Sequence, residues 1–318
     1  MSKKSKNFGF IARKPKEEDY LFEGLTQVPQ EVLVEDGQWD KYLPKVEYQL
    51  IKRTESPGHF ETSCCVTFSC LNCLELIHKR KYNEEPNFSD RFTCVISGTT
   101  PGRGNFMYKV ADSVRKNDGH VDQEVYTNSA KTQKSFYKKI PANIIQTGKE
   151  NLKDFDIKYE WVRPVNERSL KEALKYSPIQ IAIPTNWKKD KDGIYHQREP
   201  KTRCGHAVTL YGYEEGKYWK IYDHYQGNEI RHLAWDYYIG YAMKFYLTKK
   251  NNEENMNNIL YKTSGQPELY YLGKDGLYHH ILNEATFKMI WGDFKNVEIK
   301  EARITAKQIG NPLAAIVK

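Results

Sequence analysis

The chain has 318 residues with 39% hydrophobic and 13% aromatic side chains, which suffices for one large or two modest domains. Its 49 basic and 41 acidic residues give a net charge of +8, but they are dispersed, so we expect a solvated surface and no nucleic-acid partner. No apolar run approaches the roughly 18 residues of a membrane-spanning helix, and residues 1–6 lack a hydrophobic signal region. We therefore expect no membrane association and a cytoplasmic, reducing location, or a protein packaged with a virion.

By composition the chain divides into four parts. Residues 1–38 form a polar N-terminal arm, which is expected to pack on the domain surface as structure and not as a removable inhibitor. Residues 39–250 hold the main domain, and residues 251–258, rich in Asn and Glu, form a polar linker. Residues 259–318 are predicted to form a small β-rich module. Because about sixty residues hardly bury a core of their own, the module is expected to dock on the main domain or on a protein partner.

An apolar helix is predicted to begin at Cys65 and to reach residue 81. Its apolar positions fit one broad helical face; they are Val66, Phe68, Leu71, Leu74 and Ile77. Thr62 and Ser63 are candidate caps just upstream. A cysteine in the first turn lies at the positive end of the helix, which favours the attacking thiolate. The alternative is that a small cysteine simply packs the interior, which is the interpretation we prefer for Cys70 and Cys73.

Helices and strands follow one another in the rest of the main domain. Helices are predicted at about 104–117 and 168–176, and strands near 179–184, 206–213, 217–223 and 241–248. A helix-rich first half followed by a strand-rich second half is typical of an α+β fold.

A hairpin brings two chemically important residues together. The residues between the strands at 206–213 and 217–223, Glu214-Glu215-Gly216, are a turn signal. In an antiparallel hairpin the start of the first strand meets the end of the second, so His206 and Asp223 are expected to meet. Asp223 is expected to accept the imidazole Nδ1–H and to leave Nε2 for a thiol. The alternative is a structural histidine satisfied by an aspartate at the end of a hairpin.

These segments resemble the papain-like cysteine peptidases over roughly residues 39–250, in the style of a bacterial or phage relative. Cys65–Ser69 is similar to the family's Cys-Trp-Ala-Phe-Ser, Gly205–Val208 to its His-Ala-Val block, and Ile221–Tyr225 to its Ile-Lys-Asn-Ser-Trp. The interval from Cys65 to His206 also falls within the roughly 130–150 residues typical of papain-type enzymes. The resemblance implies a two-lobed fold, a helical lobe plus an antiparallel β lobe, with Cys65, His206 and Asp223 as the catalytic residues.

The resemblance also implies a substrate cleft. Either Gln49 or His59 would donate to the oxyanion, since an unusually long loop leaves both positions open. The cleft wall and the approach to the histidine would be lined by glycines, which are Gly98, Gly102, Gly104 and Gly205. The sequence departs from the family where Val66 replaces a Trp, Asp223 replaces an Asn, and Tyr225 stands where a Trp shields the histidine. Cys64 is a rival to Cys65 as the reactive thiol.

The cysteine pattern indicates neither disulfides nor a metal. Cys64 and Cys65 are neighbours that are poorly placed to bridge one another, and no counterpart of the family's disulfides is evident. The spacing of Cys70 and Cys73 lacks a second pair for zinc, and the Gly98–Gly104 segment lacks the Lys-Ser/Thr of a phosphate loop. No cofactor or metal is therefore expected.

The preferred function is a cysteine endopeptidase that hydrolyses peptide or protein substrates through a thioester intermediate. One alternative is a papain-fold structural or binding protein with little turnover, such as a component of a virion or complex. A second alternative is a transferase that uses the same three residues.

Overall fold

We analysed a computed structural model of the chain, which describes residues 9–13, 21–22, 32–43, 60–127, 129–199, 203–223, 229–250, 259–272, 277–281, 284, 297–302 and 304. The chain forms two compact units, Met1–Thr248 and Lys249–Lys318, and each is described by itself. In the described part of the chain, no helix has the length and apolar character needed to cross a membrane.

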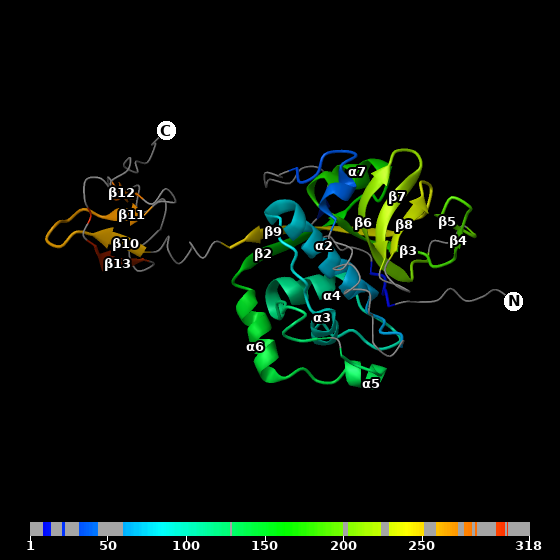
Figure 1. The fold of residues 1–318 in the computed structure, drawn as a ribbon, viewed down its shortest axis with the longest axis horizontal. Helices are drawn as coiled ribbons and strands as arrows, with labels where there is room; N and C mark the ends of the chain where they lie inside the picture. The colour runs from blue at the N-terminus through cyan, green and yellow to red at the C-terminus, as the bar shows by residue number, and fades with distance from the viewer. Residues whose placement is uncertain are drawn as a thin grey trace. The chain divides into compact units, whose positions relative to one another are not determined.

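The helices of the first unit lie mostly in its N-terminal half (Figure 1). They are the 3-10 turn Trp39–Tyr42, α2 (Cys65–Tyr82), α3 (Asp90–Ile96), α4 (Met107–Asp112), the π-helical segment Ser113–Asn117, α5 (Gln133–Phe136), α6 (Ala142–Asn151) and α7 (Glu167–Tyr176). The predicted helix at 65–81 is thus confirmed. The one predicted at 104–117 begins later, at Met107, because the extended backbone of Phe106 precedes it.

The strands of the first unit form one nine-stranded sheet in the order β1-β2-β9-β3-β6-β7-β8-β5-β4. Their bounds are Leu21–Phe22 (β1), Phe155–Val162 (β2), Ile179–Ile183 (β3), Trp187–Lys189 (β4), Ile194–Gln197 (β5), His206–Glu214 (β6), Tyr218–Asp223 (β7), Glu229–Ala234 (β8) and Tyr241–Lys249 (β9). The β1–β2 and β5–β8 pairs are parallel, and the pairs between β3, β6, β7, β8 and β9 are antiparallel. The predicted α+β fold, with a helical part and a largely antiparallel β part, is confirmed.

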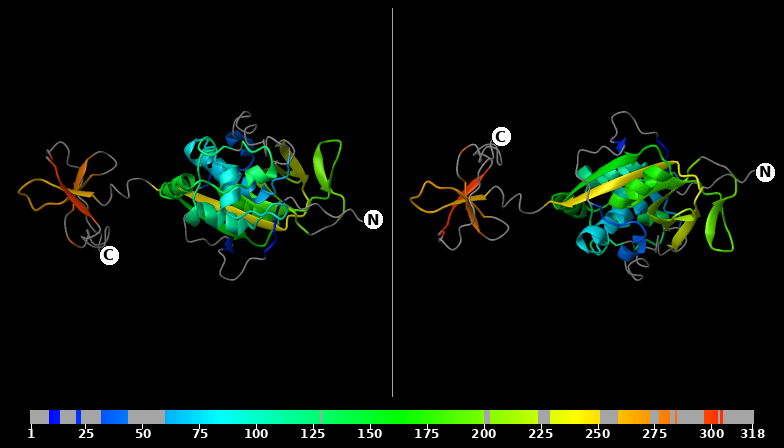
Figure 2. Two further views of the ribbon diagram at one scale, coloured as in Figure 1. Left: turned by 90° about the horizontal axis from the view of Figure 1, so that it is seen from below. Right: turned by 90° about the horizontal axis from the view of Figure 1, so that it is seen from above.

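Strand β6 contributes to the two largest apolar clusters of the first unit. Ala207 packs in one cluster with residues of α2, α4, β2 and β9, whereas Val208 and Leu210 pack in the other with residues of α7, β3 and β7. Because both faces of β6 are covered, its residues from 206 to 213 are all buried and mostly apolar. The long strand β9, yellow in Figure 2, passes along the helical part and adds Met243 and Phe245 to the first cluster.

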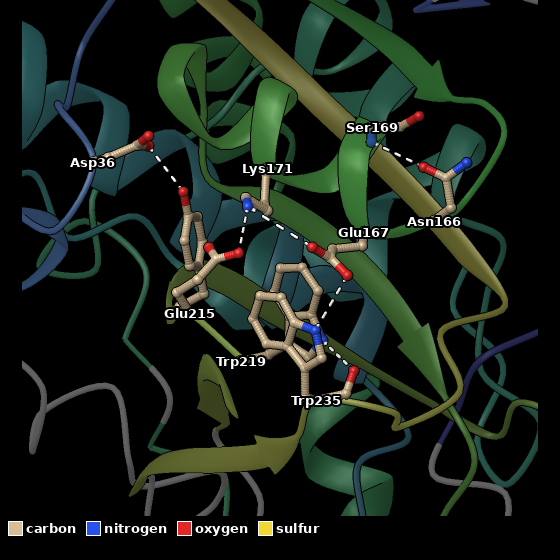
Figure 3. A network of polar contacts seen from close by, with 9 residues as sticks. Asp36, Asn166, Glu167, Ser169, Lys171, Glu215, Trp219 and Trp235 are labelled. Carbon is tan, nitrogen blue, oxygen red and sulfur yellow. Dashed lines mark hydrogen bonds and ion pairs between the residues drawn. The ribbon is translucent and has the colours of Figure 1, made fainter. Parts of the chain in front are cut away.

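The turn end of the β6–β7 hairpin is fastened to α7 by a polar network (Figure 3). Lys171 of α7 places its Nζ 2.7 Å from Oε1 of Glu215 in the hairpin turn and 3.8 Å from Oε1 of Glu167. Trp235 donates its Nε1–H to Glu167 and stacks on Trp219 of β7, with ring centroids 4.4 Å apart. This end of the hairpin is therefore anchored, and the opposite end carries His206 and Asp223.

The second unit contains a separate four-stranded sheet in the order β12-β11-β10-β13. Its strands are β10 (Ile259–Lys262), β11 (Tyr270–Leu272), β12 (Tyr278–His280) and β13 (Glu298–Glu301). Leu260 and Ile281 form a small buried cluster, packed by Leu269, Tyr271 and Val297. Two further large apolar residues of this unit, Phe287 and Trp291, lie outside the described residues.

Candidate active site

Helix α2 begins at Cys65, which is buried. The N-cap residue is Cys64, whose carbonyl accepts the Phe68 N–H at 3.0 Å and closes the first turn. The prediction that Thr62 or Ser63 caps the helix is wrong, because Ser63 adopts a left-handed backbone with a φ of 59°. Its Oγ accepts the N–H of Gly102 at 3.0 Å instead. Cys65 thus lies in the first turn, where the positive end of the helix favours a thiolate.

Side chains from the sheet hold the first turns of α2 in place. Gln180 of β3 donates through Nε2 to the Val66 carbonyl at 2.7 Å and to Ser69 Oγ at 2.8 Å. Thr209 of β6 donates through Oγ1 to the Ser69 carbonyl at 3.1 Å. All these groups are buried, so the bonds form in a low-dielectric interior where they are strong and costly to break. Cys65 therefore starts a helix that cannot readily shift against the sheet.

The starts of α2 and β6 lie at the same end of their contact. Ser69, one turn after Cys65, meets Thr209, three residues after His206. Further along both elements, Arg80 donates through Nη2 to the Tyr211 carbonyl at 2.9 Å. The two elements therefore run in the same direction, and the topology brings Cys65 and His206 to one end of the α2–β6 interface.

His206 and Asp223 form a buried hydrogen bond. The distance from His206 Nε2 to Asp223 Oδ1 is 2.8 Å, and both side chains are almost fully inaccessible, at 1% and 0% exposure. The expectation that Asp223 meets Nδ1 is wrong, because Nε2 makes this contact. Continuing the Thr209–Tyr222 pairing by one residue puts Val208 opposite Asp223, so the ring of His206 reaches diagonally across the strands with its distal nitrogen. Nδ1 is then the ring nitrogen that could serve a thiol.

Arg231 of β8 binds the second oxygen of Asp223. The distance from its Nη1 to Asp223 Oδ2 is 2.6 Å, and the Arg231 side chain is only 7% exposed. Two aromatic rings cover this ion pair: the Arg231 guanidinium carbon lies 5.7 Å from the Trp187 ring centroid and 5.3 Å from that of Tyr195. Trp187 also contacts His206 edge to face, with centroids 6.0 Å apart. Tyr225, expected to stand in the place of the shielding Trp, lies outside the described residues.

The predicted glycine wall follows α3 in the helical part. Gly98, Gly102 and Gly104 all have φ between 74° and 87°, a region that suits glycine. At Gly104 an added Cβ would lie 1.7 Å from the Gly9 carbonyl oxygen, so no larger residue fits there without rearrangement. Gly205, just before β6, donates its N–H to the Ile183 carbonyl at 3.1 Å. That bond ties the start of β6 to the end of β3.

A family model described as "Papain family cysteine protease" matches residues 53–229, which is more than half of the chain. The chain belongs to the papain family of cysteine proteases. This match confirms the predicted papain-like cysteine peptidase, and members of a protease family act on peptides or proteins. None of the curated protein sequences matches the chain significantly.

Solved structures of several proteases are similar to the chain. The chain is similar to the clostridial cysteine protease Cwp84 after propeptide cleavage, with 13% identity, a TM-score of 0.51, and 66% of this chain and 59% of that chain covered. It is also similar to the proform of the ragweed pollen allergen Amb a 11, with 17% identity, a TM-score of 0.45, and 71% and 68% covered. Bromelain from Ananas comosus in complex with the E64 inhibitor is 18% identical, with a TM-score of 0.43, and 64% of this chain and 95% of that chain are covered. At such identities the likeness concerns the fold alone.

The cysteines of this papain-family chain differ from the sequence expectation. Cys64 and Cys94 form a disulfide that joins the residue before α2 to α3, so the prediction of a chain without bridges is wrong. The bridge pairs residues 30 apart in sequence, a pairing that spacing alone does not indicate. The other four cysteines are buried and form no disulfide; they are Cys65, Cys70, Cys73 and Cys204. Burial raises the pKa of the Cys73 thiol, and raises that of Cys204 to about 12, which suits packing and not attack.

Residues 9–11 of the N-terminal arm pack against the helical part of the chain. Asn105 donates its N–H to the Gly9 carbonyl and accepts the Ile11 N–H, both at 2.9 Å. Phe10 between them is only 4% exposed and belongs to the same apolar cluster as Cys65, with its ring 5.3 Å from that of Tyr241. This part of the arm therefore packs into the domain through Phe10, because an aromatic side chain gains from an apolar interior. That the arm serves as structure and not as an inhibitor stays a prediction.

The structure does not describe two of the predicted site residues, and it adds two that were not predicted. Gln49 and His59, the candidate oxyanion donors, both lie outside the described residues. Arg231 bonds Asp223 and Trp187 contacts His206, and neither residue was predicted from the sequence. A third strand after the hairpin could have indicated Arg231. In the structure β7 pairs with β8 so that Asp223 lies opposite Glu229. Arg231, two residues after Glu229, is therefore on the same face of the sheet as Asp223.

Proposed function

We propose that this chain is a cysteine endopeptidase in which Cys65 is the nucleophile, His206 the general base and Asp223 the residue that orients the base. The observation that carries the proposal is the buried bond between His206 Nε2 and Asp223 Oδ1, at the end of the α2–β6 interface where Cys65 lies. A nucleophile, a base within reach and a third group that orients the base are what covalent catalysis requires. Because Cys64 is held in a disulfide, Cys65 is the thiol of the adjacent pair.

The proposed reaction starts with proton transfer from the Cys65 thiol to His206 Nδ1, since Nε2 is engaged with Asp223. The thiolate attacks the carbonyl carbon of the scissile peptide. The Cys65 backbone N–H and a side-chain donor, Gln49 or His59, stabilise the oxyanion, and one such donor typically contributes about 10²–10³-fold in rate. His206 then protonates the leaving amine, and water hydrolyses the thioester and releases the free thiol.

We further propose that the substrate backbone lies along the wall at Gly98 and Gly102. Beside Gly98 and Gly102 there is open space, since an added Cβ would meet no atom within 4 Å, whereas the space beside Gly104 is filled by the Gly9 backbone. We assign Gly205, adjacent to His206 in the sequence, to the approach to the base. A peptide or protein substrate is the class that this arrangement accommodates.

The test is alkylation with iodoacetamide near pH 6, with the modified residues mapped by mass spectrometry, together with cleavage of an unfolded protein substrate. We expect preferential labelling of Cys65 and loss of both labelling and cleavage in Cys65→Ala. Cys73→Ala is the matched control, because Cys73 is a buried thiol outside any disulfide, two turns later on the same helix. Equal slow labelling of every thiol, or cleavage that survives Cys65→Ala, would replace the peptidase by a papain-fold binding protein.

A further inference from the structure

A line of three polar side chains crosses three adjacent strands of the β part. His206 on β6 bonds Asp223 on β7 at 2.8 Å, and Arg231 on β8 bonds the other oxygen of the same carboxylate at 2.6 Å. Their side chains are 1%, 0% and 7% exposed. Each carboxylate oxygen thus has its own partner, and bulk water reaches none of the three groups freely.

The Arg231 guanidinium changes what Asp223 offers to His206. A buried carboxylate that faced the imidazole alone would strongly favour imidazolium, because an opposite charge within a few ångströms stabilises the charged form. Arginine stays protonated in proteins, so the Asp223–Arg231 pair has no net charge. The Trp187 and Tyr195 rings beside the guanidinium keep the pair in a low-dielectric setting, where the two charges interact strongly with each other.

We propose that Arg231 is a positioning residue of the peptidase site: it fixes the Asp223 carboxylate and cancels its charge, so that Asp223 orients His206 as a neutral acceptor would. The proposal rests on the proposed function, in which His206 is the base. It also explains how an aspartate serves at a position where the resembling enzymes carry an asparagine: the ion pair takes the place of the uncharged amide.

The charges that face the histidine set the expected pH behaviour. Those with contacts in the described part of the chain are Asp223 of β7, which bonds the imidazole, and Arg231 of β8, which acts through the same carboxylate. On the far side of Arg231, Tyr195 of β5 carries Lys189 Nζ 5.5 Å from its ring centroid. Removing the Arg231 charge leaves Asp223 to act on His206 alone. The His206 imidazolium then persists to higher pH. The alkaline limb, which is the high-pH side of the pH profile of Cys65 alkylation, shifts to higher pH with it.

The experiment compares three variants of the full-length protein with the unsubstituted chain: Arg231→Gln, Arg231→Lys and the double variant Asp223→Asn/Arg231→Gln. The matched control is Arg80→Gln, which removes another buried arginine that bonds the Tyr211 carbonyl and not Asp223. Two readouts are taken from pH 5 to 11: the rate of Cys65 alkylation by iodoacetamide, and the imidazole titration of His206 by nitrogen-15 NMR. The second readout needs no turnover.

We expect Arg231→Gln to move the alkaline limb and the His206 titration up by about 1–3 pH units, the usual effect of a nearby charge. Arg231→Lys keeps the charge and should keep the limb near its original position while lowering the rate through lost geometry. The double variant restores a neutral acceptor and should return the limb toward the original position. Arg80→Gln should lower thermal stability without moving the limb.

Two results would overturn the proposal. One is a His206 titration in Arg231→Gln that matches the unsubstituted chain even though stability falls as in Arg80→Gln, since Arg231 would then only support the fold. The other is a His206 titration in the Asp223→Asn/Arg231→Gln variant that stays at higher pH than in the unsubstituted chain. This result decides the question even when Arg231→Gln alone does not fold. If Cys65 of the unsubstituted chain is not alkylated preferentially, the proposed function fails, whereas the NMR titration still decides the role of Arg231.

Discussion

Lys244 offers a quantitative test of the energetics of this fold. It lies on β9 with a side chain that is 0% exposed, and its Nζ is 3.7 Å from Glu160 Oε2. The rings of Tyr176 and Tyr246 lie 5.1 Å and 4.5 Å from the same nitrogen. Burial lowers the pKa of this lysine to about 7, against an opposing effect of Glu160. The substitution to test is Lys244→Met, which keeps an unbranched side chain of similar length and removes the ionisable amine.

The sign and magnitude follow from proton linkage. An unfolded lysine titrates at 10.5, so between about pH 7 and 10.5 the unfolded chain holds a proton that the folded chain has released. The free energy of unfolding therefore rises with pH in this window, by about 1.4 kcal/mol per pH unit. At pH 7 the buried ammonium costs about 4 kcal/mol relative to an unshifted lysine. Lost contacts with the tyrosine rings offset about 0.5–2 kcal/mol of the gain in Lys244→Met.

The assay is urea unfolding of both chains at several values between pH 7 and 9.5. We expect Lys244→Met to be the more stable protein at pH 7, by about 2–3 kcal/mol, and its advantage to shrink by about 1.4 kcal/mol per pH unit. Other titrating groups act equally on both chains, so the difference isolates Lys244. Lys175→Met is the control, because Lys175 is partly exposed and its pKa is raised by Glu172. A constant difference between Lys244→Met and the unsubstituted chain across this pH range would refute the reasoning.

Three further outcomes are expected. Gln180→Leu removes the side-chain bonds to the first turns of α2, so the free energy of unfolding should fall by about 1–3 kcal/mol and alkylation of Cys65 should slow. Gln146→Leu on the surface of α6 is the control. Unchanged alkylation in Gln180→Leu would contradict the role of Gln180 in holding the start of α2. Phe10→Ala leaves a cavity at a buried position and should lower the free energy of unfolding in urea by up to about 3–5 kcal/mol. Deletion of residues 1–18 should not raise peptidase activity, and a large rise would identify the arm as an inhibitor. A chain that ends at Asn252 should stay folded by circular dichroism and retain Cys65 alkylation, and loss of alkylation would place residues 259–318 at the site.

The elements that sequence reasoning predicted are those whose signal is local. The helix from Cys65 to Tyr82 follows from its apolar period, and the β6–β7 hairpin follows from alternation on either side of the turn at Glu214–Gly216. The meeting of His206 with Asp223 came from the same hairpin logic. The choice of ring nitrogen did not, because it depends on a diagonal offset between strands that only the actual register fixes.

What escaped prediction depends on contacts between distant segments. Strand β8 mixes charged and apolar residues without a clear period, so its pairing with β7, and with it the Arg231–Asp223 bond, needed the folded sheet. Strand β5 pairs with β8 in parallel, an arrangement that no turn signal announces. The Cys64–Cys94 bridge likewise depends on how α3 packs beside the start of α2. Phe10 belongs to the same apolar cluster as Cys65 although the surrounding arm is polar.

The Cys64–Cys94 bridge has a practical consequence for handling the protein. Thiol enzymes are commonly prepared in a reductant to keep the nucleophile free, and disulfides are opened by attack of a thiolate on one sulfur. Here the same reagent acts on a bridge whose sulfur belongs to the residue next to Cys65. Opening it would create a second thiol beside the first and release the tether to α3. Preparations should therefore be compared across reductant concentrations, with free thiols counted each time, before any rate is assigned to Cys65.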